Sequence, residues 1–172
     1  MGAQFQVRLT NIRMEIYSER GNMVKNTDLN TQSWELTQVG VVVRDVEKAV
    51  KQLSSMGIGP FRAMTLPPTR QEWFRDKPMN AEFNIQGAKI GDVDLELIQP
   101  LSGESPHKEF LDTKGEGIQH VMFAVDNLEK TTAQLIEKGA SILLRAKFPG
   151  GSGVAYVDLG IGGIIFELVQ KR

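Results

Sequence analysis

The sequence contains no cysteine, which excludes disulfide bonds, thiolate metal sites and a cysteine nucleophile. It lacks any apolar run close to the roughly 18 residues that a membrane-spanning helix needs. Its N-terminus lacks the basic and then apolar pattern of a secretory signal peptide. These absences favour a cytoplasmic protein that does not act on membranes. Histidine is also scarce, with only two in the whole chain, so the position of each one is informative.

A strong charge of either sign is missing too. The formal net charge is −1, which provides no general attraction to nucleic acid or to an anionic membrane. The 172 residues are 41% hydrophobic and 24% charged, which is typical of a soluble globular domain. A chain of this length can bury one ordinary hydrophobic core.

The chain contains an internal repeat. The stretch from Thr37 reads TQVGVVVRDVEKAVKQLSSMG, and the stretch from Gln119 reads QHVMFAVDNLEKTTAQLIEKG. Each copy predicts an apolar strand, a charged turn, an amphipathic helix and a terminating glycine. Three further strands are expected after each helix, and the last ones also match, GDVDLELIQ at 91–99 with GGIIFELVQ at 162–170. Both halves therefore read βαβββ, an α+β architecture whose two units pack into one core.

The repeat divides the chain into parts. Residues 1–33 form an N-terminal extension, either an ordered or flexible arm or an edge strand that pairs with a partner. Residues 34–172 form the main domain, with module one at 36–99, a connection at 100–117 and module two at 118–170. The connection is expected to hold a short helix and a solvated second histidine.

Four polar residues occupy matched positions in the two modules. Gln38 and His120 lie on the first strands, and Glu96 and Glu167 lie on the last strands. Strand alternation places them on the face opposite their apolar neighbours, and a buried carboxylate needs a partner. Two carboxylates, an imidazole and an amide oxygen suit a divalent cation. The alternatives are an ordinary core histidine and glutamates on a solvent face.

The stretch at 62–80 has no clear strand or helix period and is long for an idle connection. Its part from Met64 to Asn80 contains two aromatic and three basic residues: Arg70, Trp73, Phe74, Arg75 and Lys77. It is either a lid that meets an anionic or partly apolar substrate or an ordinary surface loop with tucked aromatics.

The run ELIQPLSGESPHKEFLDTKGEGIQH, with the closing FELVQ, is similar to the methylmalonyl-CoA epimerase family of the vicinal oxygen chelate superfamily. The resemblance covers roughly residues 36–170. It implies two βαβββ modules in an incomplete, cupped β-barrel with helices outside. It also implies a homodimer and one metal ligand from the first and last strand of each module. The family usually has histidine where this chain has Gln38 and Gln119.

By this resemblance the metal ligands are Gln38, Glu96, His120 and Glu167, a set similar to that of some glyoxalase I enzymes. The cofactor is a divalent ion such as Co, Ni, Mn, Mg or Zn, and oxygen-rich ligation favours the first four. Glu167 is the first candidate base and Glu82 the second.

Three functions follow as hypotheses. The first is a metal-dependent epimerase or isomerase that removes a proton α to a carbonyl, acting on an acyl-CoA-like thioester or another chelating carbonyl substrate. The second is a lactoylglutathione lyase of the glyoxalase I type. The third, of another class, is a non-catalytic small-molecule binding or resistance protein. An extradiol dioxygenase is disfavoured because its iron site needs two histidines, and one histidine belongs to the predicted site.

Overall fold

A computed structural model describes residues 6–10, 13–17, 23–24 and 29–171. The chain divides into two compact units, 1–31 and 32–172. The first unit contains a three-stranded antiparallel sheet of β1 (Gln6–Thr10), β2 (Arg13–Tyr17) and β3 (Met23–Val24). Much of the predicted polar arm, including residues 18–22 and 25–28, lies outside the described residues. The boundary at residue 33 therefore stays a prediction.

The second unit follows the predicted order of elements, with short additions. A 3-10 turn, η1 (Thr31–Ser33), leads into module one, which has β4 (Glu35–Val42), α1 (Val46–Ser55), β5 (Arg62–Met64), β6 (Gln71–Phe74), β7 (Lys77–Pro78), β8 (Glu82–Ile90) and β9 (Val93–Ser102). The connection holds α2 (Pro106–Lys114). Module two has β10 (Gly117–Val125), α3 (Leu128–Glu137), β11 (Ser141–Lys147), β12 (Gly153–Asp158) and β13 (Ile165–Gln170).

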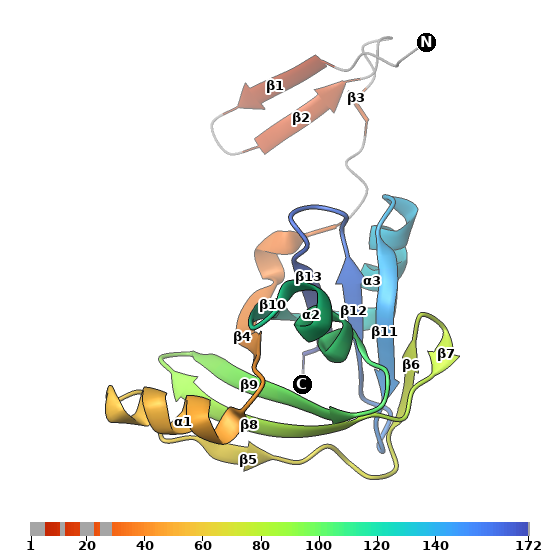
Figure 1. Cartoon of the computed structure of the whole chain (residues 1–172). Helices are drawn as coiled ribbons and strands as arrows, with labels where there is room; N and C mark the ends of the chain where they lie inside the picture. Colours follow the sequence, from red (N-terminus) through yellow and green to blue (C-terminus); the bar gives the residue numbers. More distant parts are fainter. Residues whose placement is uncertain (1–5, 11–12, 18–22, 25–28, 172) are drawn as a thin grey trace. The chain divides into compact units, whose positions relative to one another are not determined.

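Ten strands form one sheet in the order β5-β8-β9-β4-β10-β13-β12-β11-β6-β7. The first and last long strands of each module pair in parallel, β4 with β9 and β10 with β13, and the modules join through the antiparallel pair β4–β10. The sheet curls into a half-barrel (Figure 1). The predicted α+β fold with a cupped sheet is confirmed.

The two main helices begin in equivalent ways. Asp45 accepts a hydrogen bond from the backbone N–H of Lys48 at 2.9 Å, and Asn127 accepts one from Lys130 at 2.8 Å. Each side chain satisfies one of the N–H groups that a helix start leaves unpaired. α1 contacts β8 and β9, and α3 contacts β11, β12 and β13. Within the part of the chain that is described, no helix is long and apolar enough to cross a bilayer.

β8 runs without a break to Ile90, and Gly87 within it pairs with both Arg62 and Glu96. One sequence prediction needs correction. The stretch 62–80 is not irregular throughout, since it contains β5, β6 and β7. β6 extends the sheet at β11 of the second module, and a strand of four residues is too short to show a period.

Candidate functional site

The sheet register brings the four matched residues together. On one row, Gly40 of β4 lies between Glu96 of β9 and His120 of β10. On the next row, Met122 of β10 lies beside Glu167 of β13. Gln38 is paired with Met122.

Gly40 makes the approach of these side chains possible. A Cβ atom at this position would lie 1.9 Å from Cε1 of the His120 ring. Real side chains do not reach such a distance, so the imidazole occupies the space that any other residue would fill. The ring passes over Gly40 toward Glu96, the neighbour of Gly40 on the other side.

The polar atoms of the cluster converge closely. His120 Nε2 lies 3.1 Å from Glu167 Oε2 and 3.6 Å from Glu96 Oε2. Gln38 Nε2 donates to Glu96 Oε2 at 2.8 Å and lies 3.5 Å from His120 Nε2. All four residues are buried, with His120 fully inaccessible. Although His120 Nε2 is this close, Glu167 Oε2 has no hydrogen-bond partner among the described residues.

Gln119 determines where His120 carries its proton. Its Oε1 atom lies 2.7 Å from His120 Nδ1, and a carboxamide oxygen only accepts hydrogen bonds, so Nδ1 carries a proton. In the neutral ring, Nε2 then presents its lone pair toward two carboxylates. This arrangement is stable only if a positive charge, either a second proton or a cation, lies between them. From the sequence, Gln119 was recognised only as a position where the epimerase family usually has histidine.

The pKa values follow from this crowding of charge. Burial, together with the charge of Glu167, raises the pKa of Glu96 to about 7, and the charge of His120 offsets part of that rise. Burial by itself lowers the pKa of His120. Contact with Glu167 and the charges of both glutamates outweigh burial, so the pKa of His120 is raised above its usual 6.5.

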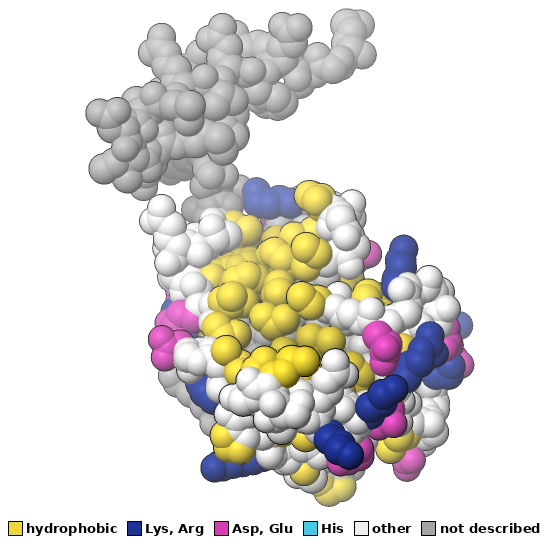
Figure 2. Space-filling model, turned by 60° about the vertical axis from the view of Figure 1, so that its left-hand side comes forward, with side chains coloured by type: hydrophobic (Ala, Val, Ile, Leu, Met, Phe, Trp, Pro, Cys, Tyr) yellow, Lys and Arg dark blue, Asp and Glu magenta, His cyan; other side chains and the backbone are white. Residues whose placement is uncertain are grey.

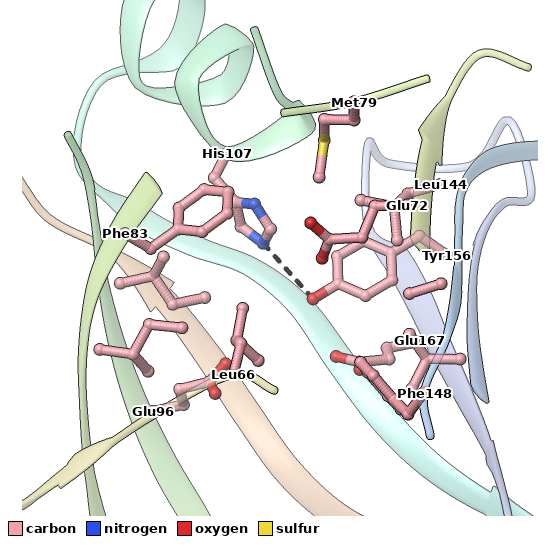
Figure 3. Close-up of a pocket in the computed structure, with 14 residues that line it drawn as sticks. Leu66, Glu72, Met79, Phe83, Glu96, His107, Leu144, Phe148, Tyr156 and Glu167 are labelled. Carbon is pink, nitrogen blue, oxygen red and sulfur yellow. Dashed lines mark hydrogen bonds between the residues drawn. The ribbon is translucent and has the colours of Figure 1, made fainter. Parts of the chain in front are cut away.

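The cluster opens into a mostly apolar pocket with a cavity volume of about 70 Å³ (Figure 3). Its lining includes side chains from both modules: Leu66, Glu72, Met79, Phe83, Ile85, Glu96, Ile98, His107, Leu144, Ala146, Phe148, Val154, Tyr156 and Glu167. A few polar groups in an apolar cavity are typical of a small-molecule site.

Glu72 is a pocket carboxylate that the sequence did not single out. It lies on β6 opposite Ala146, and its side chain is 9% exposed. Arg70 places Nε 2.9 Å from Glu72 Oε2, so this basic residue of the predicted lid pairs with a pocket glutamate. Arg75 instead forms two hydrogen bonds with the exposed Glu109.

Glu82 is not part of the pocket. Its side chain is exposed and accepts a hydrogen bond from Ser102 Oγ at 3.3 Å. The next residue, Phe83, lines the pocket. The four predicted ligands thus come together, whereas the predicted second base does not join them.

His107 is not solvated, contrary to the expectation from its polar neighbours. It is 6% exposed because it lies on the inner side of α2, beside Pro106 and Leu111, which are also buried. Its Nε2 atom lies 3.4 Å from the hydroxyl of Tyr156. Burial, and then the charge of His120, lowers the pKa of His107 to about 3.

The residues of the cluster fit a divalent cation in their chemistry. Among the described residues, no group of three or more histidine, aspartate and glutamate side chains is arranged to hold a metal as it stands. The cluster nevertheless offers an imidazole nitrogen and two carboxylates, one with a buried oxygen that lacks a hydrogen bond. Gln38 presents Nε2 to Glu96, so ligation through its oxygen requires the terminal amide to turn over, which is a soft rotation.

Comparison with known proteins agrees with this architecture. The family description Glyoxalase/Bleomycin resistance protein/Dioxygenase superfamily matches residues 37–156. Mitochondrial methylmalonyl-CoA epimerase from Bos taurus is 34% identical over 85 residues, which are 47% of this chain and 49% of that protein.

Two solved structures share the fold. A hypothetical protein from Bacillus halodurans has a TM-score of 0.63 at 24% identity, over 81% of this chain and 96% of its own. Methylmalonyl-CoA epimerase from Streptomyces coelicolor, in complex with 2-nitronate-propionyl-CoA, has a TM-score of 0.58 at 18% identity, over 80% of this chain and 96% of its own. At these identities both establish the fold alone.

Proposed function

This chain belongs to the Glyoxalase/Bleomycin resistance protein/Dioxygenase superfamily, and from this premise we propose that it is a divalent-cation-dependent epimerase or isomerase. Its reaction would remove a proton from the carbon next to a carbonyl or thioester. The observation that carries the proposal is His120 Nε2, the ring nitrogen that points away from Gln119 and faces two buried carboxylates. Similarity to methylmalonyl-CoA epimerase supports a thioester as the substrate.

In this proposal Gln38, Glu96, His120 and Glu167 hold the cation. When bound, the cation would act as a Lewis acid and stabilise the negative charge that builds on the carbonyl oxygen as the α-proton leaves. The cluster favours this role because it gathers two carboxylates and an imidazole nitrogen in a buried site. The homodimer implied by the resemblance is part of the proposal.

Proton transfer at one carbon with inversion requires acid–base groups on its two faces. Glu167 is one candidate, because it lines the pocket. We propose Glu72 as the other, in place of the exposed Glu82. Figure 3 draws Glu72 and Glu167 on either side of the Tyr156 ring. Arg70 Nε lies 2.9 Å from Glu72 Oε2 and holds this carboxylate at the pocket wall.

Two experiments test the proposal. Cation-loaded protein in heavy water should exchange the α-hydrogen of methylmalonyl-CoA for deuterium, and removal of the cation with a chelator should stop the exchange. The variants Glu72→Gln and Glu167→Gln should each lower the rate by about two orders of magnitude or more. Glu82→Gln is the matched control and should exchange like the wild type. Absence of exchange with loaded wild-type protein would refute the epimerase.

The other hypotheses have their own tests. A lactoylglutathione lyase would form a thioester from methylglyoxal and glutathione, and it would use Glu96 and Glu167 as its bases. A binding or resistance protein would retain its fold but remain free of metal after loading with divalent cations. Metal content and the two product assays therefore separate all three functions.

A further inference from the structure

The two edges of the ten-stranded sheet are joined by a short piece of chain. β5 lies at one end of the strand order, and the pair β6–β7 lies at the other end. Residues 65–70, here called the strap, connect β5 to β6. The chain from Met64 to Gln71 reaches at most about 25 Å, so the curled sheet brings its two edges at least this close. The strap crosses the gap between these edges of the half-barrel (Figure 1).

Two side chains attach the strap to the walls of the pocket. Leu66 lines the pocket (Figure 3). The guanidinium group of Arg70 donates to the carbonyl oxygen of Ala81 at 3.2 Å and to that of Pro67 at 3.4 Å. Ala81 directly precedes β8, a strand that also lines the pocket. Within the described part of the chain no residue of the strap belongs to a strand, so these side-chain contacts are what fasten it.

The same guanidinium group contacts a carboxylate of the pocket. Arg70 Nε lies 2.9 Å from Glu72 Oε2, and the two side chains are only 19% and 9% exposed. An ion pair that is shielded from water in this way is stronger than one on the surface. Because one planar group makes all of these contacts, displacement of the strap breaks the contact with Ala81 or the contact with Glu72.

We infer from this network that Arg70 is a positioning residue, which holds the Glu72 carboxylate at the pocket wall while the strap is closed. Closure of the strap and placement of the second acid–base group are then a single event. The inference rests on the proposed function for the role of Glu72. The fastening of the strap by Arg70 can be measured without that role.

The absence of cysteine from the chain lets one introduced thiol report on the strap. Ala146→Cys places a thiol at a buried position of the pocket wall, which the thiol reagent DTNB reaches when the strap opens. Adding Arg70→Gln removes the charged hydrogen bonds to Ala81 and Pro67, so the thiol should react about tenfold faster or more. Arg62→Gln removes an exposed charge from the neighbouring β5 and should leave the rate unchanged.

A second thiol position separates opening of the strap from a general loss of stability. Ala155 and Ala146 are both 4% exposed, but only Ala146 lines the pocket. Arg70→Gln should therefore leave the reaction of Ala155→Cys unchanged. Equal acceleration at the two positions would mean that Arg70 only stabilises the fold as a whole. No acceleration at either would mean that Arg70 does not fasten the strap. Either result overturns the inference.

A double-mutant cycle tests whether Arg70 acts through Glu72. Arg70→Gln alone should slow the α-hydrogen exchange of methylmalonyl-CoA by about ten- to a hundredfold, because a small misplacement of an acid–base group has an effect of this size. In the Glu72→Gln background the same change should have little further effect, since the group that Arg70 positions is gone.

The outcomes of the cycle separate the two claims. A full second loss in the Glu72→Gln background would show that Arg70 acts independently of Glu72, and the positioning role would be wrong. If Glu72→Gln exchanges like the wild type, Glu72 is not the second base and the positioning role falls with it. If wild-type protein does not exchange at all, the proposed function is wrong, and the thiol rates still decide whether Arg70 fastens the strap.

Discussion

At the scale of single residues, Gln119 orients His120, because its side-chain oxygen lies 2.7 Å from Nδ1 and Nε2 is left to face the site. When a residue that hydrogen-bonds to a metal ligand is mutated, the metal affinity typically falls by about 10- to 100-fold. Gln119→Leu keeps the volume but removes the acceptor, so we expect cobalt affinity to fall within that range. Gln119→Glu retains an acceptor and should bind cobalt at least as tightly as the wild type. Equal affinity in the leucine variant would show that Gln119 does not orient the ring.

His107 should give the protein a distinct pH dependence. The unfolded chain takes up a proton at His107 near pH 6.5, whereas burial lowers the pKa in the folded protein to about 3. The free energy of unfolding therefore falls as the pH drops below 6.5. By pH 5 the loss amounts to about 2 kcal/mol.

His107→Leu cannot bind this proton, so its free energy of unfolding should fall by about 2 kcal/mol less than that of the wild type between pH 7 and pH 5. Urea denaturation of both proteins at the two pH values, without added metal, measures the difference. Parallel pH profiles would mean that His107 is solvated, as its polar neighbours in the sequence suggest.

At the scale of elements, the site depends on how β4 and β10 pair. Gly40→Ala would place a methyl group inside the His120 ring, so the ring must move away from Glu96. We expect the variant to lose metal binding and to unfold about 1–3 kcal/mol more easily. Gly87→Ala is the control, because its Cβ would come closest to Met64, 2.6 Å from Sδ and 3.4 Å from Cγ, and Met64 is a half-exposed flexible side chain that can move aside. Similar metal affinity in the two variants would contradict this packing.

How well each element was predicted depends on whether its signal is local. The strands around Gln38 and His120 and the helices after Asp45 and Asn127 could be predicted, because alternation, helical period and caps lie within one short stretch. Glu72 could not, because β6 is four residues long and pairs with β11. His107 was missed because the packing of α2 against the sheet, and not its polar neighbours, decides which side of the helix is buried.

The four-residue cluster could be predicted only because the chain repeats. Comparison of the two modules showed that Gln38 corresponds to His120 and Glu96 to Glu167, and the sheet pairs these strands in the same way in both modules. The comparison of the two modules did not single out Tyr156. The polar pair that Tyr156 forms with His107 was therefore found only in the structure.

At the scale of the whole molecule, the sheet has one face toward the pocket and one outer face. On the outer face of β4 and β10, Val39 pairs with Val121 and Leu36 pairs with Phe123. α1 and α3 contact strands on either side of this pair. Hydrophobic side chains gather over one face of the molecule in Figure 2. The pseudo-twofold axis that relates the two modules passes through this apolar face. Such a face suits a second copy of the chain, because a twofold dimer buries the same patch on both subunits.

We therefore expect the protein to elute with the mass of a dimer in light scattering after size-exclusion chromatography. Leu36→Lys should shift the mass toward the monomer, because it places a charge within the buried interface. Ile90→Lys is the matched control, since Ile90 is exposed to a similar extent, 46% against 44%, but lies at the end of β8. A wild-type protein that is monomeric at all concentrations would contradict the dimer.

The central claim is that His120 and its three partners bind a divalent cation, and metal content tests it most directly. Wild-type protein loaded with cobalt and then passed through a desalting column should retain about one ion per chain by mass spectrometry, as a single site requires. His120→Ala should retain close to none, while Glu82→Gln should match the wild type. A folded wild-type protein without metal, or an alanine variant that keeps its cobalt, would contradict the claim.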